Sequence, residues 1–129
     1  MAYEIPGLKI TLEAAADLSS AQFKFVKLDA NGKVVAIAAA TDVPIGVLQN
    51  KPTSGQAAEL MVDGVTKLQA DAALTPGTAI GTSADGQADA KVAGTDITEY
   101  AVGVVLEGAG AAGNLCTARI VCGLPNRAA

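Results

Sequence analysis

Residues 43–70, VPIGVLQNKPTSGQAAELMVDGVTKLQA, contain the clearest strand and turn signals of the chain. A short apolar run at 45–48 is followed by NKPTSG, where Pro fixes one φ and Gly accepts a positive φ without steric cost. Apolar side chains then occupy every second position from 58 to 62, which is the period of a half-buried strand. Asp63-Gly64 gives a second turn signal before another apolar segment. We therefore predict three short strands joined by two turns.

A later stretch, residues 101–123 (AVGVVLEGAGAAGNLCTARIVCG), resembles this one. Its glycines at 103, 113 and 123 match those at 46, 55 and 64, at offsets of 57, 58 and 59 residues. The segments DANG and SADG, and two Thr-Asp pairs, match at an offset of 54. We predict two related halves, at about 27–70 and 80–123. The alternative is that β proteins reuse glycine turns and that the match is fortuitous.

Short strand signals recur along the rest of the chain, and no window has the period of a long amphipathic helix. Residues 14–20 fit either one helical turn or a loop. Asn31-Gly32 predicts a type I′ hairpin turn, and Pro76-Gly77 predicts a type II turn. About nine strands with regular turns predict an all-β fold, a small single-domain β-barrel or β-tulip-like sandwich of short antiparallel strands. The further strands are expected at 8–12, 22–28, 34–40, 79–81, 87–92, 100–106 and 115–122.

We expect an N-terminal arm with the first strand at 1–12, a β domain at 13–123, and a tail at 124–129. Of the 129 residues, 50% are hydrophobic but only 3% are aromatic, so the core is aliphatic and thin. Such a domain gains from partners that bury more surface. The start of the chain has no basic segment followed by an apolar one, and no apolar run approaches the length of a membrane span. These features predict a soluble protein made inside the cell, with no membrane partner.

The chemistry-bearing residues are few. A net charge of −4 and a pI of about 4.6 argue against a nucleic-acid partner. The chain has no histidine, and its two cysteines, Cys116 and Cys122, lie on one face of a predicted strand, roughly 20 Å apart. That separation is too large for a disulfide within the strand, so we expect buried free thiols. A disulfide between chains is the less favoured alternative.

No nucleophile–base set, metal site or cofactor site is evident, and we expect no catalytic, metal-binding or cofactor-binding residues. The string GAGAAG at 108–113 has the spacing of a dinucleotide-binding loop, but a strand rather than a helix follows it. The two Asp-containing turns lack the further oxygen ligands of a calcium loop. The sequence therefore predicts a protein that is not an enzyme.

Six segments follow one another in a recognisable order: FVKL (25–28), PIGVLQN (44–50), SGQAA (54–58), VDGV (62–65), LTPG (74–77) and VGVVLE (102–107). Their order resembles small capsid decoration proteins of tailed bacteriophages, also called cement or head-stabilising proteins. The resemblance covers about residues 8–122.

The resemblance implies a structural virion protein that binds the outside of a capsid and stabilises the expanded head as trimers at threefold positions. Its partner would be the major capsid protein, and it would be assembled in the host bacterial cytoplasm. The N-terminal arm would complete a sheet with the capsid protein. The contact candidates on the arm are Tyr3, Ile5, Leu8, Ile10 and Leu12.

Two other hypotheses compete with this one. A surface-displayed β module that binds carbohydrate would need exposed rings, and the chain offers Tyr3, Tyr100, Phe23 and Phe25, of which both Phe are expected in the core. A small hydrolase is disfavoured by the missing histidine.

Overall fold

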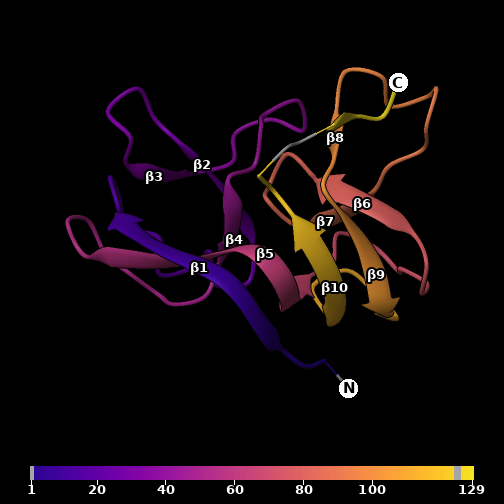
Figure 1. Ribbon diagram of the computed structural model, residues 1–129, viewed down its shortest axis with the longest axis horizontal. Coiled ribbons are helices and arrows are strands. Elements are labelled where there is room, and N and C mark those ends of the chain that lie inside the picture. The colour runs from indigo at the N-terminus through magenta and orange to yellow at the C-terminus, as the bar shows by residue number, and fades with distance from the viewer. Residues whose placement is uncertain (1, 124–125) are drawn as a thin grey trace.

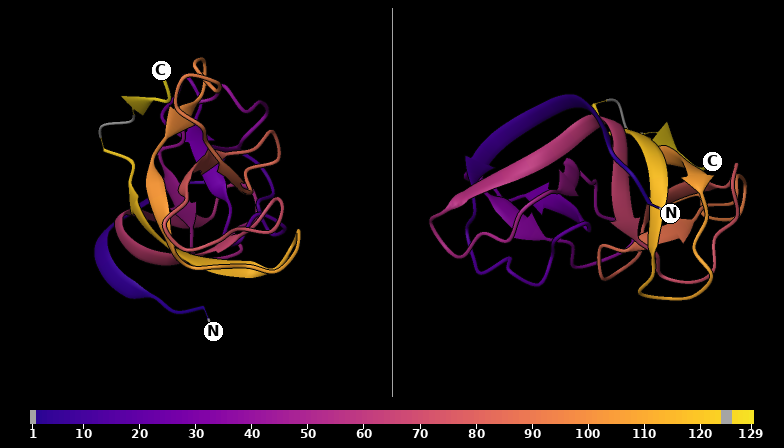
Figure 2. Two further views of the ribbon diagram at one scale, coloured as in Figure 1. Left: turned by 90° about the vertical axis from the view of Figure 1, so that its right-hand side faces the viewer. Right: turned by 90° about the horizontal axis from the view of Figure 1, so that it is seen from below.

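The computed structural model describes residues 2–123 and 126–129, and every regular element within that part of the chain is a β-strand (Figure 1). One antiparallel sheet holds nine strands in the order β3-β2-β4-β5-β10-β9-β6-β7, with β1 paired to β5 outside this path. The sheet curls into a half-barrel (Figure 2), which confirms the predicted all-β class. The strands are β1 (Ile5–Glu13), β2 (Phe25–Leu28), β3 (Val34–Ala36), β4 (Gly46–Leu48), β5 (Ala57–Gln69), β6 (Ala79–Thr82), β7 (Ala88–Ala90), β8 (Tyr100–Ala101), β9 (Gly103–Glu107), β10 (Leu115–Val121) and β11 (Asn126–Arg127).

The long strand β5 joins the two sides of the sheet, because it pairs with β1, β4 and β10. It runs through Asp63-Gly64 without a turn, so the predicted second turn of this region is wrong. Gly64 serves a different purpose, since a Cβ there would lie 2.8 Å from the backbone nitrogen of Gly7 in β1. The glycine signal marked a close approach of two strands.

The β2–β3 hairpin forms where Asn31-Gly32 predicts it, but its turn is not type I′. Gly32 has a φ of 74°, whereas Asn31 does not have the positive φ that type I′ requires. The carboxylate of Asp29 accepts hydrogen bonds from the backbone nitrogens of Asn31 and Lys33, at 2.8 and 3.0 Å. This is the wider turn in which a single glycine adopts a left-handed conformation.

Hydrogen bonds of one half of the sheet recur in the other half. We call residues 5–62 the first unit and residues 63–121 the second unit, so that β5 begins in one and ends in the other. The matching positions are separated by 54 to 58 residues. The bond from Asp29 N to Lys33 O matches that from Ser83 N to Gln87 O. The bond from Ile45 N to Val26 O matches that from Val102 N to Ile80 O. The bond from Gly55 N to Ala14 O matches that from Gly113 N to Ala70 O.

The order of the strands has the same symmetry. In the sheet, β2, β3 and β4 lie on one side of β5, and β6, β7 and β9 occupy the corresponding places beyond β10. The pairing of β1 with β5 also corresponds to that of β5 with β10. The recurrence therefore begins in β1, upstream of the halves expected at 27–70 and 80–123.

Buried side chains form two clusters that match the two units. The smaller cluster belongs to the first unit and includes Val26, Val34, Leu48 and Leu60. The larger cluster lies in the second unit but also contains residues of the first. The members from the first unit are Phe25, Ile37, Val47, Met61 and Val62.

Three further expectations have a structural outcome. Residues 14–20 contain no helical turn. Phe23 lies before β2, in a turn with a φ of 61°, rather than within a strand beside Phe25. Part of the predicted tail forms β11, which pairs with β8, while residues 124–125 lie outside the described part of the chain.

Candidate functional site

The two thiols of the chain are buried and unpaired, as predicted. Burial raises the pKa of the Cys116 thiol. Burial, with the nearby charge of Asp63 as a smaller cause, raises the pKa of Cys122 to about 12. Both thiols are therefore protonated near neutral pH and poor nucleophiles.

Charged groups that could act in chemistry lie in ion pairs or are scattered. The described residues contain no group of three or more His, Cys, Asp or Glu side chains placed to hold a metal ion. The buried ammonium of Lys91 lies 2.6 Å from a carboxylate oxygen of Glu99 and 2.9 Å from one of Asp89. Burial lowers the pKa of Lys91, but its hydrogen bonds to Glu99 and Asp89 outweigh that effect and raise the pKa. In this cluster two carboxylates stabilise a positive charge inside the fold.

The predicted arm is a paired strand for most of its length. β1 pairs with β5 from Ile5 to Glu13, with irregular register between Ile5 and Lys9. The backbone nitrogen of Tyr3 donates a 2.8 Å hydrogen bond to the hydroxyl of Thr117. Among the described strands β1 pairs with β5 alone, so its other edge is open (Figures 1 and 2).

The five contact candidates on the arm divide into two groups. Tyr3, Ile5 and Leu8 are 40%, 58% and 58% exposed. Ile10 and Leu12 are partly buried and pack against the core clusters. The structure thus places three of the five candidates on the surface, beside the start of β1, and uses the other two to attach the strand to the body.

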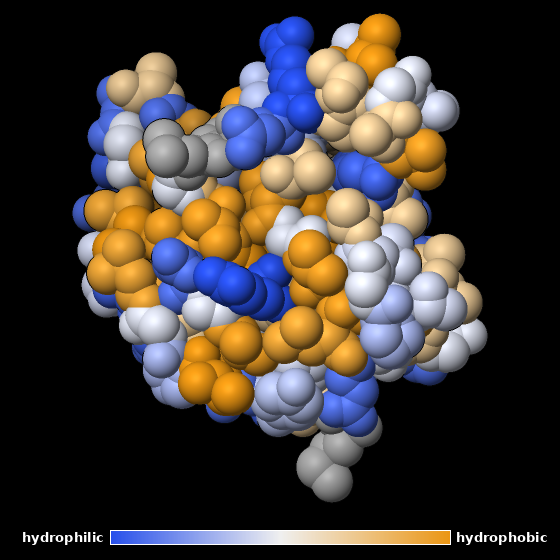
Figure 3. Space-filling view, turned by 45° about the vertical axis from the view of Figure 1, so that its right-hand side comes forward, coloured by the Kyte–Doolittle hydropathy of each residue, from blue (hydrophilic) through white to orange (hydrophobic). Residues whose placement is uncertain are grey.

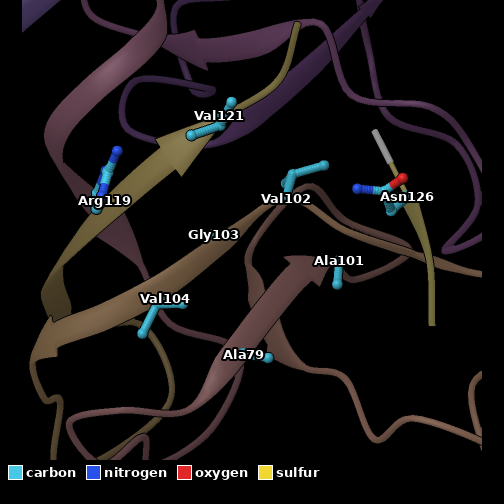
Figure 4. A pocket seen from close by; sticks show the side chains of 8 residues that line it. All are labelled: Ala79, Ala101, Val102, Gly103, Val104, Arg119, Val121 and Asn126. Atoms are coloured by element: carbon cyan, nitrogen blue, oxygen red, sulfur yellow. The ribbon is translucent and has the colours of Figure 1, made fainter. Parts of the chain in front are cut away.

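A second surface, which the sequence alone did not single out, lies on β9 and β10. A groove of about 430 Å³ is formed there by backbone and side chains of β6, β8, β9, β10 and β11 (Figure 4). Hydrophobic side chains gather on this side of the molecule (Figure 3), and Val104 and Val121 are 43% and 41% exposed. Arg119 makes no ion pair with any described residue and lies at the groove. The lining residues are Ala79, Ala101, Val102, Gly103, Val104, Arg119, Val121 and Asn126.

The signal for this surface was present but concealed. Residues 100–106 read as a fully buried strand by composition, which hid the alternation that exposes Val104 and Leu106. When the two predicted halves are aligned, Arg119 corresponds to the apolar Met61. At this position the exchange of an apolar for a charged residue coincides with a change from a buried to an exposed side chain.

The aromatic side chains do not form an exposed platform. Phe25 is buried, at 1% exposure. The ring of Phe23 lies 5.6 Å from the ammonium of Lys67, and the ring of Tyr100 lies 5.7 Å from the guanidinium of Arg127. Only Tyr3 among the four is exposed.

The described part of the chain contains no helix, and therefore no helix that could span a membrane.

Comparisons with known proteins give a fold rather than a family. No family model and no curated protein sequence matches the chain. The head fiber gp8.5 N base of bacteriophage phi29 superposes with a TM-score of 0.64 at 17% sequence identity, covering 89% of this chain and 94% of that one. A chain in the capsid of Myoviridae phage XM1 superposes with a TM-score of 0.65 at 19% identity, covering 91% of this chain and 84% of that one. The chain therefore has an all-β fold that is shared, over most of its length, with proteins of phage heads.

Proposed function

We propose that this protein is a structural component of a phage virion that binds the outside of the capsid and stabilises the expanded head. The observation that carries the proposal is the fold, which is similar over about nine-tenths of the chain to two proteins whose structures come from phage heads. The proposal agrees with the motif resemblance in the sequence. The major capsid protein is the proposed partner, and trimers at threefold positions are the proposed arrangement.

The open edge of β1 is the proposed contact with the shell. A strand at a sheet edge offers unpaired main-chain groups to a segment of another protein, and neighbouring side chains supply specificity. Tyr3, Ile5 and Leu8 present apolar surface at this place. Pro6 and the irregular register around it limit pairing by unrelated strands, because Pro cannot donate a main-chain hydrogen bond.

The test is co-sedimentation of the purified protein with capsids of the source phage, before and after expansion of the shell. We expect saturable binding to expanded shells only, with an increase in their melting temperature. The variants Ile5→Asp and Leu8→Asp should weaken binding by about tenfold or more, since a charge would be buried at the contact. Val92→Asp is the matched control, because Val92 has a similar exposure, 57%, but lies outside β1.

Absence of binding to both kinds of shell would contradict the proposal. Carbohydrate recognition would then become the leading alternative. The rings of Phe23 and Tyr100 do not support it, because Lys67 and Arg127 lie over them.

A further inference from the structure

The first unit has an outer face that the second unit buries. This face consists of Phe25, Val47 and Met61, which are paired side by side across β2, β4 and β5. All three are at most 1% exposed and belong to the core cluster that fills the second unit. They would lie on the surface if the second unit were absent.

Two backbone hydrogen bonds fix this internal contact. Phe25 N donates to Gly86 O at 2.7 Å, and Gln69 N donates to Phe23 O at 2.8 Å. The second unit therefore receives the first through a turn that contains Gly86 and through the end of β5. A Cβ at Gly86 would lie 2.7 Å from the carbonyl oxygen of Phe25, so the contact leaves no room for a side chain there.

The second unit has the same outer face, but the described chain leaves it exposed, with Ala101 and Asn126 only at the side of the groove. The corresponding residues Ala79, Val104 and Arg119 are also paired side by side, on β6, β9 and β10. They are exposed, and they line the groove of Figure 4. The uncovered face thus occupies the position at which a further unit would pack.

We call the part of the second unit that contacts the first, at Gly86 and the end of β5, the receiving surface. The first unit has a corresponding surface, and that copy is exposed. Gly32 corresponds to Gly86, and the two have similar φ values of 74° and 83°. Gly86 is buried, whereas an added Cβ at Gly32 would meet nothing within 4 Å. Leu12, which corresponds to the fully buried Leu68, is only partly buried, and Glu13 at the end of β1 is exposed.

One molecule therefore carries an unused copy of each side of its own internal interface. We propose that copies of this chain associate head to tail, with the outer face at Ala79, Val104 and Arg119 of one protomer packed on the surface around Gly32 and Leu12 of the next. A contact between two different surfaces repeats from chain to chain, and it forms a ring if the rotation closes. The number of chains in this ring, three with six units in total, rests on the trimer of the proposed function.

The occupant of the groove is thus a second copy of the chain rather than an unrelated ligand. The internal interface shows that a surface with this backbone geometry accepts this outer face. The side chains differ between the two contacts, because Ala79 and Arg119 replace Phe25 and Met61. The external contact is therefore smaller and more polar than the internal one, as expected for subunits that fold separately before they associate.

The test uses two single variants of the full chain and their mixture, measured by sedimentation velocity. Val104→Asp damages the outer face, and Gly32→Asn adds a side chain to the receiving surface while tolerating its positive φ. We expect trimers for the wild type and monomers for each variant. Because each variant keeps the surface that the other lacks, an equimolar mixture should give dimers and no trimers. Val92→Asp should stay trimeric.

A wild-type monomer at millimolar concentration, or trimers of Val104→Asp, would overturn the proposal. So would a mixture of the two variants that stays monomeric. Ala79→Asp serves as a second outer-face variant if Val104→Asp fails to fold by circular dichroism. The co-sedimentation experiment separates the two proposals, since a trimer that does not bind capsids would refute the capsid role alone.

Discussion

Phe23 has a strained backbone conformation that costs the corresponding glycine of the second unit nothing. Phe23 has a φ of 61°, and no other non-glycine residue in the described part of the chain has a positive φ. The corresponding residue of the second unit is Gly77, with a φ of 87°. A left-handed conformation costs a non-glycine residue about 1–2 kcal/mol. The ring of Phe23, which lies against Lys67 of the second unit, offsets this cost by joining the two units.

Replacement of Phe23 by Ala and by Gly separates strain from contact. Both variants lose the ring, but only Gly relieves the strain, so Phe23→Gly should be more stable than Phe23→Ala by about 1 kcal/mol in urea unfolding. At the neighbouring Lys24, which has no positive φ, the order should reverse, because Gly loses more conformational entropy. Equal stability of the two Phe23 variants would show that the strain is released elsewhere.

A buried ion pair predicts a second effect at the scale of single residues. Lys91→Met would leave the carboxylates of Asp89 and Glu99 without their cation and should cost about 2 kcal/mol of unfolding free energy at pH 7. The pKa of Lys91 is raised above 10.5 on folding, so its contribution is present below that pH and is lost as the pH rises through the raised value. The difference between wild type and variant should therefore shrink above pH 10.5.

The exposed pair of Lys33 and Glu13 is the control for this experiment. Its distance of 2.6 Å is as short as that of Lys91 to Glu99, but its side chains are 45% and 50% exposed. At protein concentrations too low for association, Lys33→Met should have little effect, because water screens exposed charges. A Lys91→Met variant as stable as the wild type in thermal melts would refute the role of burial.

At the scale of elements, β1 is attached to the body at a point where two glycines meet. A Cβ on Gly7 would collide with the backbone of Asp63, and a Cβ on Gly64 would lie 2.8 Å from the nitrogen of Gly7. The close approach lets β1 follow the curvature of β5 despite its irregular register. The open edge proposed for capsid binding depends on this attachment.

Gly7→Ala should therefore loosen the start of β1. We expect a loss of about 2 kcal/mol in unfolding free energy, typical of overpacking, together with faster amide hydrogen exchange in β1. Gly110→Ala is the control, since a Cβ there meets nothing within 4 Å. Unchanged exchange in β1 of the Gly7 variant would mean that the strand can shift away from β5 without cost.

At the scale of the whole molecule, two units share one long strand, and an unused copy of each side of their mutual interface is exposed. Association that occurs only in the folded state stabilises it by mass action. The melting temperature of the free protein should therefore rise with protein concentration, as scanning calorimetry can measure. Val104→Asp should abolish this dependence, whereas Val92→Asp should keep it. A melting temperature independent of concentration in the wild type would contradict head-to-tail association.

The sequence determined the local features of this protein, because turns and strand periods depend on neighbouring residues. The alternation before Asp63, the Asn31-Gly32 hairpin and the glycines shared by the two halves predicted an all-β chain with an internal recurrence. Tertiary structure decided the continuity of β5 through Gly64, because that glycine makes room for Gly7 of β1, a strand distant in sequence. It also decided which faces are covered. Val47 and Val104 have the same local pattern, and only the packing of one unit on the other buries the first and exposes the second.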